Sequence, residues 1–447
     1  MTYQPIIGLE VHVELKTKSK LFCGCPAEHF GTKPNTQTCP VCLGLPGALP
    51  VPNKKAVDWT ILLGLALNCS IHKVSRFDRK NYFYPDLPKG YQISQYDEPL
   101  ASKGFVKIDT KKIRIRRVHL EEDAGKLLHE EVNGVKSTLV DFNRSGVALV
   151  EIVTEPDVRS SEEARTFLKK MRQIARYLGI SDGDMEKGTM RLEPNISVKL
   201  ETRNTKHEDD LPPYKVEIKN INSFNFAKKA IDFEIARQVS LLEKGETPLQ
   251  ETRGWDEKKG VTVSQRGKGE AHDYRYFPEP DIPPMEFSKS QIENLRSQIP
   301  ELAEEKIARF IREYNLSQYD AEILCDSRER AEYYESTIRE LKNLRIKELT
   351  EKTVANWIIN KKVDTSKVAP EDLVKMIAAT TQTTSMPDEE LEKIIKEVIS
   401  KNPKAVADYQ GGKEQALMFL IGQVMRETKG KRGFDKMKTV IEQRLNA

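Results

Sequence analysis

Leu9-Glu10-Val11-His12-Val13-Glu14-Leu15, near the N-terminus, alternates apolar and polar side chains without a break. Successive residues of a β-strand point to opposite faces, so this stretch predicts a strand whose apolar residues pack into a core. Glu10, His12 and Glu14 then share the other face of the same strand. This short stretch already predicts a sheet with one packed face and one charged face.

Two later stretches, 191–198 and 216–219, show the same alternation and carry charged residues on one face. In the second stretch Glu217 and Lys219 lie on that face together. One interpretation is an antiparallel sheet whose second face is simply solvated. The residue types favour another, because carboxylates and an imidazole that recur on several strands are typical of groups that converge on a cation.

Composition limits the class of protein. At about 150 residues per domain, 447 residues predict two or three domains. Lys plus Arg is 72 and Asp plus Glu is 68, and this near balance excludes a uniformly basic nucleic-acid coat protein. No apolar run approaches the roughly 18 residues of a membrane span, and the N-terminus shows no signal or transit segment. We therefore expect a cytoplasmic protein with no membrane partner.

The hydrophobic pattern of the sequence changes once, from strand-like to helical. Up to about residue 290, short alternating segments broken by Gly, Pro and Asn predict a strand-rich fold. A helix interrupts it, because Ser160 and Glu163 form a capping-box pattern and Gly179 supplies a stop. The Pro-rich stretch 278–284 is interpreted as a linker. Beyond it the pattern is helical, with a polar division near 380–385.

Four of the six cysteines fall in one short window. Two close thiol pairs joined by a loop can close a tetrahedral zinc site with four sulfur ligands, which leaves no open position for a substrate. The alternative is that reduced thiols merely lie near one another. We expect structural Zn²⁺, held by Cys23, Cys25, Cys39 and Cys42.

A second cluster of candidate ligands lies in the segment 119–126, where Glu121, Glu122 and Asp123 are consecutive. Three adjacent acids cannot all face one way in a strand, so a bulge or turn is predicted there. Their mutual repulsion is costly unless a cation or solvent relieves it. Pooled with the acids and the imidazole of the first strand, these residues predict a site for Mg²⁺ or Mn²⁺ with phosphate.

Two aromatic stretches, 79–86 and 273–278, interleave cations with Tyr and Phe. Such stretches can stack a base and hold its phosphates, although aromatic residues beside Pro also serve as hydrophobic anchors of their own loop. Neither a Walker A motif nor G-x-G-x-x-G occurs in the sequence. Any use of ATP must therefore rely on a different phosphate cradle.

Five segments together, 7–15, 77–86, 119–126, 217–224 and 273–281, resemble the family of B subunits of the aspartyl/glutamyl-tRNA amidotransferases. The resemblance runs from the first strand to the C-terminal helices. It implies an α+β fold with three domains. These are a β-rich cradle and catalytic domain with an antiparallel barrel-like sheet and a zinc loop near 23–42 (1–290), a helical domain (291–385) and a small YqeY-like helical tail that binds tRNA (386–447).

The resemblance also implies a reaction. It is the ATP-dependent transamidation of misacylated Glu-tRNA(Gln), Asp-tRNA(Asn) or both to Gln-tRNA(Gln) and Asn-tRNA(Asn). This chain would phosphorylate the side-chain carboxylate and amidate it with ammonia. It lacks a Gly/Ser-rich amidase signature, so a partner amidase, the A subunit, would supply the ammonia, within a heterotrimer that includes a small C subunit.

By the same resemblance, roles fall on particular residues. Position 193 is Glu where Asp is expected, and the basic run 429–438 would hold the tRNA backbone unless it is an ordinary solvated helix end. The expected Mg²⁺ ligands are Glu10, His12, Glu122 and Glu217, with Glu121 and Glu193 as near neighbours and Glu121 also catalytic. The expected phosphate and nucleotide contacts are Lys80, Tyr82, Lys219 and Arg275.

Two other functions remain open from the residues alone. A non-catalytic RNA-binding protein with a zinc knuckle would need no acidic strand face. A metal-dependent phosphohydrolase acting alone would turn over ATP or a phosphoester without tRNA.

Overall fold

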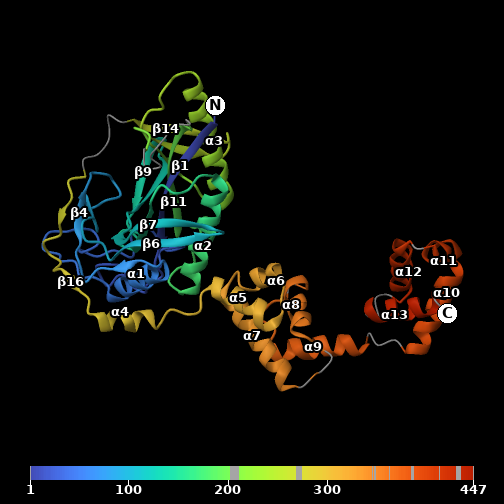
Figure 1. Cartoon of the computed structure of the whole chain (residues 1–447). Coiled ribbons are helices and arrows are strands. Elements are labelled where there is room, and N and C mark those ends of the chain that lie inside the picture. The colour runs from blue at the N-terminus through green and yellow to red at the C-terminus, as the bar shows by residue number, and fades with distance from the viewer. Residues whose placement is uncertain are drawn as a thin grey trace. The chain divides into compact units, whose positions relative to one another are not determined.

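The computed structural model folds as two compact units, Met1–Ala303 and Glu304–Ala447 (Figure 1). The structure describes residues 2–201, 211–267, 274–344, 346, 349–361, 363–383, 387–411, 413–428 and 434–445.

The first unit is built on one nine-stranded sheet in which all neighbours are antiparallel except the parallel pair β12–β13. In spatial order its strands are β14 (Val261–Gly267), β13 (Glu251–Asp256), β12 (Val216–Lys219), β11 (Met190–Glu201), β1 (Thr2–Glu14), β10 (Ala148–Thr154), β7 (Lys111–Glu122), β6 (Ala101–Ile108) and β2 (Ser70–Ile71).

The expected α+β fold, with a strand-rich part followed by helices, is confirmed, but the sheet is open and its expected barrel-like form is wrong. Over the described residues it runs from the edge strand β14 to the edge strand β2. Closure would require these two edges to pair along a common ladder. β2 has only two residues, and both pair with β6, so it offers no ladder to a further strand.

The predicted alternation of β1 is confirmed. Leu9, Val11, Val13 and Leu15 are at most 1% exposed and belong to one hydrophobic core. The core also contains buried residues of three helices, α1 (Lys54–Ala66), α2 (Ser161–Tyr177) and α3 (Phe224–Glu243). α2 and α3 run side by side along the sheet in Figure 1. The helices therefore cover the apolar face of β1 and leave the face of Glu10 to other partners.

The predicted start and end of α2 are confirmed at both ends. The Ser160 side chain accepts a hydrogen bond from the Glu163 backbone N–H, and Gly179 adopts φ +69° after the last turn. Only half of the capping box forms. The Glu163 carboxylate accepts from the Arg159 backbone N–H instead of from that of Ser160, at 2.9 Å.

Short strands extend the first unit beyond the large sheet. They form a three-stranded sheet, a two-stranded sheet and a hairpin. The strands are β15 (Phe277–Pro278), β4 (Asp78–Asn81) and β5 (Tyr91–Ser94); β16 (Met285–Glu286) and β3 (Val74–Ser75); and β8 (Lys126–Val132) with β9 (Val135–Asp141).

The Pro-rich stretch 278–284 is not a linker, and that prediction is wrong. Glu279 is buried, and its carboxylate accepts two hydrogen bonds from Arg79, at 2.7 and 2.8 Å. Ile282 lies in the core, as does Leu295 of α4 (Lys289–Arg296). Buried charge pairing and apolar contacts therefore hold this stretch on the first unit.

The second unit is helical and contains two hydrophobic clusters, one within residues 310–377 and one within 391–445. The expected boundary at 385 falls at 384–386, outside the described residues. The helices are α5 (Ala303–Tyr314), α6 (Gln318–Leu324), α7 (Arg328–Asn343), α8 (Glu351–Asn360), α9 (Pro370–Thr383), α10 (Asp388–Lys401), α11 (Pro403–Gln410), α12 (Glu414–Glu427) and α13 (Phe434–Leu445).

The basic run expected to bind tRNA lies largely outside the described residues, because 429–433 are not among them. Lys438 is described, on α13, and pairs with Glu442 at 3.8 Å. Its role in binding tRNA stays a prediction. Among the described helices of both units, none combines the length and apolar character that crossing a membrane requires.

Candidate active site

The charged face of β1 lies at the middle of the sheet, where strand register brings acids from other strands beside it. Glu10 is the Cα partner of Glu193 on β11, and His12 is the partner of Glu151 on β10. Glu151 in turn faces His119 on β7. Residues directly opposite in antiparallel strands share a face of the sheet, so these side chains meet.

The first group of ligand atoms consists of carboxylates only. Glu10, Glu193 and Glu217 each offer an oxygen, and these oxygens all lie within 4.8 Å of one another. Lys219 contacts two of them, at 2.7 Å to Glu193 and 3.5 Å to Glu217. The Asn195 side-chain amide donates to Glu10 at 3.0 Å.

Electrostatics separates two of these carboxylates. Burial raises the pKa of Glu10, and the charges of Glu151, Glu193 and Glu217 raise it further. Burial also acts against ionisation of Glu193, but the ammonium of Lys219 outweighs it and lowers the pKa of Glu193 to about 2. The group is therefore a set of close negative charges that one lysine only partly compensates.

The second group combines an imidazole with two carboxylates, and its ligand atoms also lie within 4.8 Å of one another. His12 Nε2 is 3.5 Å from Glu151 and 3.9 Å from Glu121. Burial acts to lower the pKa of His12, but Glu151 leads the charges that raise it to about 9. His12 Nδ1 is buried and has no hydrogen-bond partner among the described residues.

The two groups adjoin, because Glu10 feels the charges of both Glu151 and His12. Their donors fit a divalent cation. Carboxylate oxygens are the ligands that Mg²⁺ and Mn²⁺ prefer, and Mn²⁺ also accepts imidazole in mixed sites. Beyond the effect of burial, the neighbouring carboxylates raise the pKa of Glu10 by repulsion, and such a cation would relieve that repulsion.

The two predicted lysines lie beside these groups. Lys219 contacts Glu193 and Glu217 of the first group. The Lys80 ammonium lies 5.0 Å from the Tyr274 ring centroid and 5.9 Å from that of Tyr82. Burial opposes its charge, yet the pKa of Lys80 is raised, with Glu121 as the largest favourable cause. Lys80 is therefore a half-buried cation at the border of the second group.

The remaining predicted nucleotide contacts, Tyr82 and Arg275, lie near Lys80. The Tyr82 ring packs against that of Tyr274 at 5.8 Å, and burial raises the pKa of Tyr82. Arg275 is exposed and has φ +41°, and its backbone carbonyl accepts a hydrogen bond from Asn81 at 2.8 Å. This bond joins the segment before β15 to the end of β4.

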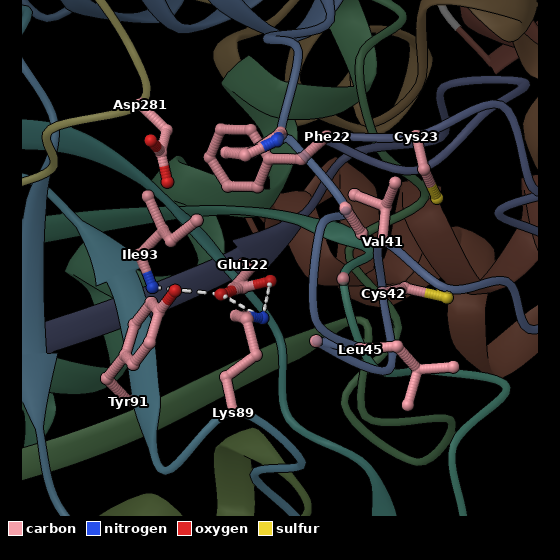
Figure 2. A pocket seen from close by; sticks show the side chains of 14 residues that line it. Phe22, Cys23, Val41, Cys42, Leu45, Lys89, Tyr91, Ile93, Glu122 and Asp281 are labelled. Atoms are coloured by element: carbon pink, nitrogen blue, oxygen red, sulfur yellow. Dashed lines mark hydrogen bonds and ion pairs between the residues drawn. The ribbon is translucent and has the colours of Figure 1, made fainter.

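Glu122 does not join the carboxylates with which it was grouped. Adjacent residues of β7 point to opposite faces, so Glu122 turns away from the side of Glu121. Its carboxylate pairs with Lys89 at 2.8 Å and accepts from the Ile93 backbone N–H at 2.9 Å, as Figure 2 shows. Together with Cys42 these residues line a cavity of about 150 Å³.

The structure brings two residues to the site that sequence reasoning did not select, Glu151 and His119. Glu151 is the one charged residue of β10, a wholly buried strand whose other residues are apolar except for Thr154. A lone acid in such a run is costly without a partner, and this signal could have identified it. His119 lies in the segment 119–126 but was not selected, and its alternation with Glu121 along β7 was the available signal.

The four clustered cysteines also gather, with sulfur atoms all within 4.8 Å of one another. Lys20 is fully buried beside them and donates to the Cys42 sulfur at 3.7 Å. The pKa of Cys42 is lowered to about 4, first by its hydrogen bond with Cys23. Four sulfurs with a low-pKa thiol and a nearby ammonium fit the thiolate donors of a structural zinc site.

Comparison with known protein families finds two matches in this chain. Residues 5–293 match the family described as "GatB/GatE catalytic domain", and residues 333–445 match that described as "GatB domain". These matches cover the large sheet with its charged face and most of the helical unit.

Two relatives are similar over their whole length. One, the B subunit of the aspartyl/glutamyl-tRNA(Asn/Gln) amidotransferase from Thermotoga petrophila, is 47% identical and spans 100% of this chain and 99% of its own. The protein of the same name from Carboxydothermus hydrogenoformans is 45% identical over 99% of each chain. The chain therefore belongs to the family of aspartyl/glutamyl-tRNA(Asn/Gln) amidotransferase B subunits.

Proposed function

We propose that this chain carries out the ATP-dependent transamidation of Glu-tRNA(Gln), Asp-tRNA(Asn) or both. Its relatives are named for an amidotransferase that acts on these tRNAs. The observation that carries the proposal is the pair of adjoining ligand groups on one sheet face, bordered by Lys80 and Lys219.

The chemistry explains why such a face is needed. A carboxylate does not accept ammonia directly, because oxide and hydroxide are poor leaving groups. Transfer of the γ-phosphoryl group of ATP to a carboxylate oxygen of the tRNA-bound Glu or Asp gives an acyl phosphate and ADP. Ammonia then attacks the acyl carbon, phosphate leaves, and a proton is lost from nitrogen, which gives the amide.

Phosphoryl transfer depends mainly on positioning and charge neutralisation. Glu10, Glu193 and Glu217 would hold one divalent cation. His12, Glu121 and Glu151 would offer a second set of ligands beside it. A cation bound there supplies positive charge to phosphate oxygens. We assign Glu121, rather than Glu122, to this site, because its carboxylate lies with those of the second group.

The two lysines would act on the phosphate itself. Both are half-buried, and nearby carboxylates raise the pKa of each, so they remain protonated at neutral pH and carry fixed positive charge. Lys80 would meet the transferred phosphoryl group from the side of β4 and Lys219 from the side of β12. Tyr82 and Arg275, near Lys80, would contact the nucleotide.

Ammonia would come from a partner. The sequence has no Gly/Ser-rich amidase signature, so glutamine hydrolysis is assigned to an amidase, the A subunit, in a heterotrimer with a small C subunit. Delivery inside the assembly would protect ammonia from protonation and exclude water from the acyl phosphate. The helical tail would bind the tRNA, and zinc would hold the cysteine loop.

The test is a transamidation assay of the assembled complex with Glu-tRNA(Gln) or Asp-tRNA(Asn), ATP, glutamine and Mg²⁺. We expect His12→Ala and Glu10→Gln to abolish formation of Gln-tRNA or Asn-tRNA, while glutamine hydrolysis by the complex persists. Equal loss of both activities would indicate failed assembly. Full transamidation by the Glu10→Gln complex would show that the acidic face is not needed for the reaction and would leave this chain a role in binding RNA only. ATP turnover without tRNA would favour a phosphohydrolase.

A further inference from the structure

We propose that His119 is a positioning residue that fixes the Glu151 carboxylate for a cation bound by His12, Glu121 and Glu151. This inference rests on the proposed function. It assigns a task to a buried histidine that the transfer reaction itself does not use.

The contacts of His119 form a directed chain. Its Nε2 atom lies 3.1 Å from Glu151 and 3.5 Å from Glu121, so it reaches both carboxylates of the second group. On the other side of the ring, Arg117 Nε donates to His119 Nδ1 at 3.3 Å. His119 is itself only 2% exposed.

The arginine contact defines which ring nitrogen carries the proton. An arginine N–H can only donate, so Nδ1 accepts in this hydrogen bond. The proton of the imidazole then sits on Nε2, the atom that faces Glu151. Arg117 is in turn held against the Tyr96 ring, 5.7 Å from its centroid, and that ring stacks on Tyr276 at 4.3 Å.

Comparison of the two histidines that flank Glu151 separates their roles. His12 Nε2 is 3.5 Å from Glu151, and its buried Nδ1 has no hydrogen-bond partner among the described residues. Both nitrogens of His119 are engaged, one by Arg117 and one by the carboxylates. One ring nitrogen of His12 is therefore uncommitted among the described residues, whereas both ring nitrogens of His119 have partners, and this difference assigns the supporting role to His119.

A carboxylate fixed in this way loses less conformational freedom when a cation binds. Hydrogen-bond partners that orient metal ligands commonly contribute about 10–100-fold to metal affinity. His119→Ala should remove the donor and leave the Glu151 carboxylate free to turn. His119→Gln keeps an N–H close to the position of Nε2, so it should restore most of the affinity.

The experiment measures Mn²⁺ binding, by the loss of the free-ion electron paramagnetic resonance signal, to the full chain purified with its partner subunits. We expect His119→Ala to weaken Mn²⁺ binding by about 10–100-fold. His119→Gln should stay near wild type, and Arg117→Met should show a smaller loss because His119 keeps its bond to Glu151. His129→Ala is the histidine control, since His129 contacts Thr138 on the β8–β9 hairpin.

Three results would overturn the inference in distinguishable ways. Wild-type affinity in a folded His119→Ala protein would remove the positioning role. Equal loss in His119→Ala and His119→Gln would make His119 a ligand rather than a support. Absence of Mn²⁺ binding by the wild-type complex would reject the metal site of the proposed function, and the positioning role with it. Unchanged zinc content and thermal midpoint would establish that each variant folds.

Discussion

Glu10 and Glu193 face each other directly across β1 and β11, yet their surroundings favour opposite protonation states. Burial and three neighbouring carboxylates raise the pKa of Glu10. Lys219, 2.7 Å from Glu193, lowers the pKa of that carboxyl to about 2 despite its burial. Glu10 is thus a carboxylate whose charge a cation would stabilise, whereas Glu193 already has Lys219 as its partner.

Lys219→Met should separate metal binding from phosphate chemistry. The ammonium of Lys219 repels a cation held by Glu193, so its removal should leave Mn²⁺ affinity unchanged or tighter. Transamidation should fall by about 10²–10³-fold if Lys219 neutralises the transferring phosphate. The measurements are Mn²⁺ titration and single-turnover transamidation. Glu193→Gln is the matched comparison and should weaken Mn²⁺ binding. Loss of Mn²⁺ affinity in Lys219→Met would contradict the assignment.

Cys39→Ser should lower zinc content and the stability of the first unit, and should change turnover less. A closed four-sulfur site stabilises a fold but presents no open position to substrate. Zinc per chain would be measured by mass spectrometry and stability by thermal unfolding. Cys69→Ala is a matched control, because Cys69 lies buried in the core away from the four-cysteine group. A zinc-free variant of full stability would argue against the site.

Glu279→Gln should destabilise the first unit by about 3–5 kcal/mol, because it leaves the paired guanidinium of Arg79 without its buried counter-charge. The neighbouring Asp281 also contacts Arg79, at 3.3 Å, but is 40% exposed. Asp281→Asn should therefore cost no more than about 1 kcal/mol. Urea unfolding of the two variants provides the comparison. Equal effects would show that burial does not distinguish the two carboxylates.

Asp157 should contribute stability that disappears in acid. Burial opposes its ionisation, but hydrogen bonds from Arg114 outweigh this and lower its pKa. A depressed folded-state pKa stabilises the fold above the unfolded value of about 3.9, and this contribution is lost as pH falls through the folded pKa. The difference in unfolding free energy between wild type and Asp157→Asn should be constant from pH 7 to 5. It should shrink below about pH 4. A difference that grows in acid would reverse the assigned sign.

The sequence by itself determined the local features. Alternation placed Glu10 and His12 on one face of β1, and Ser160 and Gly179 marked the ends of α2. The close spacing of Cys23, Cys25, Cys39 and Cys42 predicted that they meet, because only a short loop joins the two pairs. In each case the structure follows from residues close together in the chain, where backbone geometry limits the choices.

Only the tertiary structure decided which acids complete the site. Val118 and Leu120 already implied that Glu122 shares their apolar side if β7 continues to that residue, but the three consecutive acids equally allowed an earlier turn. Glu151 reaches His12 because β10 pairs with β1, and Glu279 is buried because Arg79 lies on β4. Such pairings depend on non-local packing, which no local pattern specifies. The open edges of the sheet, at β14 and β2, also depend on non-local packing, because the pairing of strands decides whether the sheet closes.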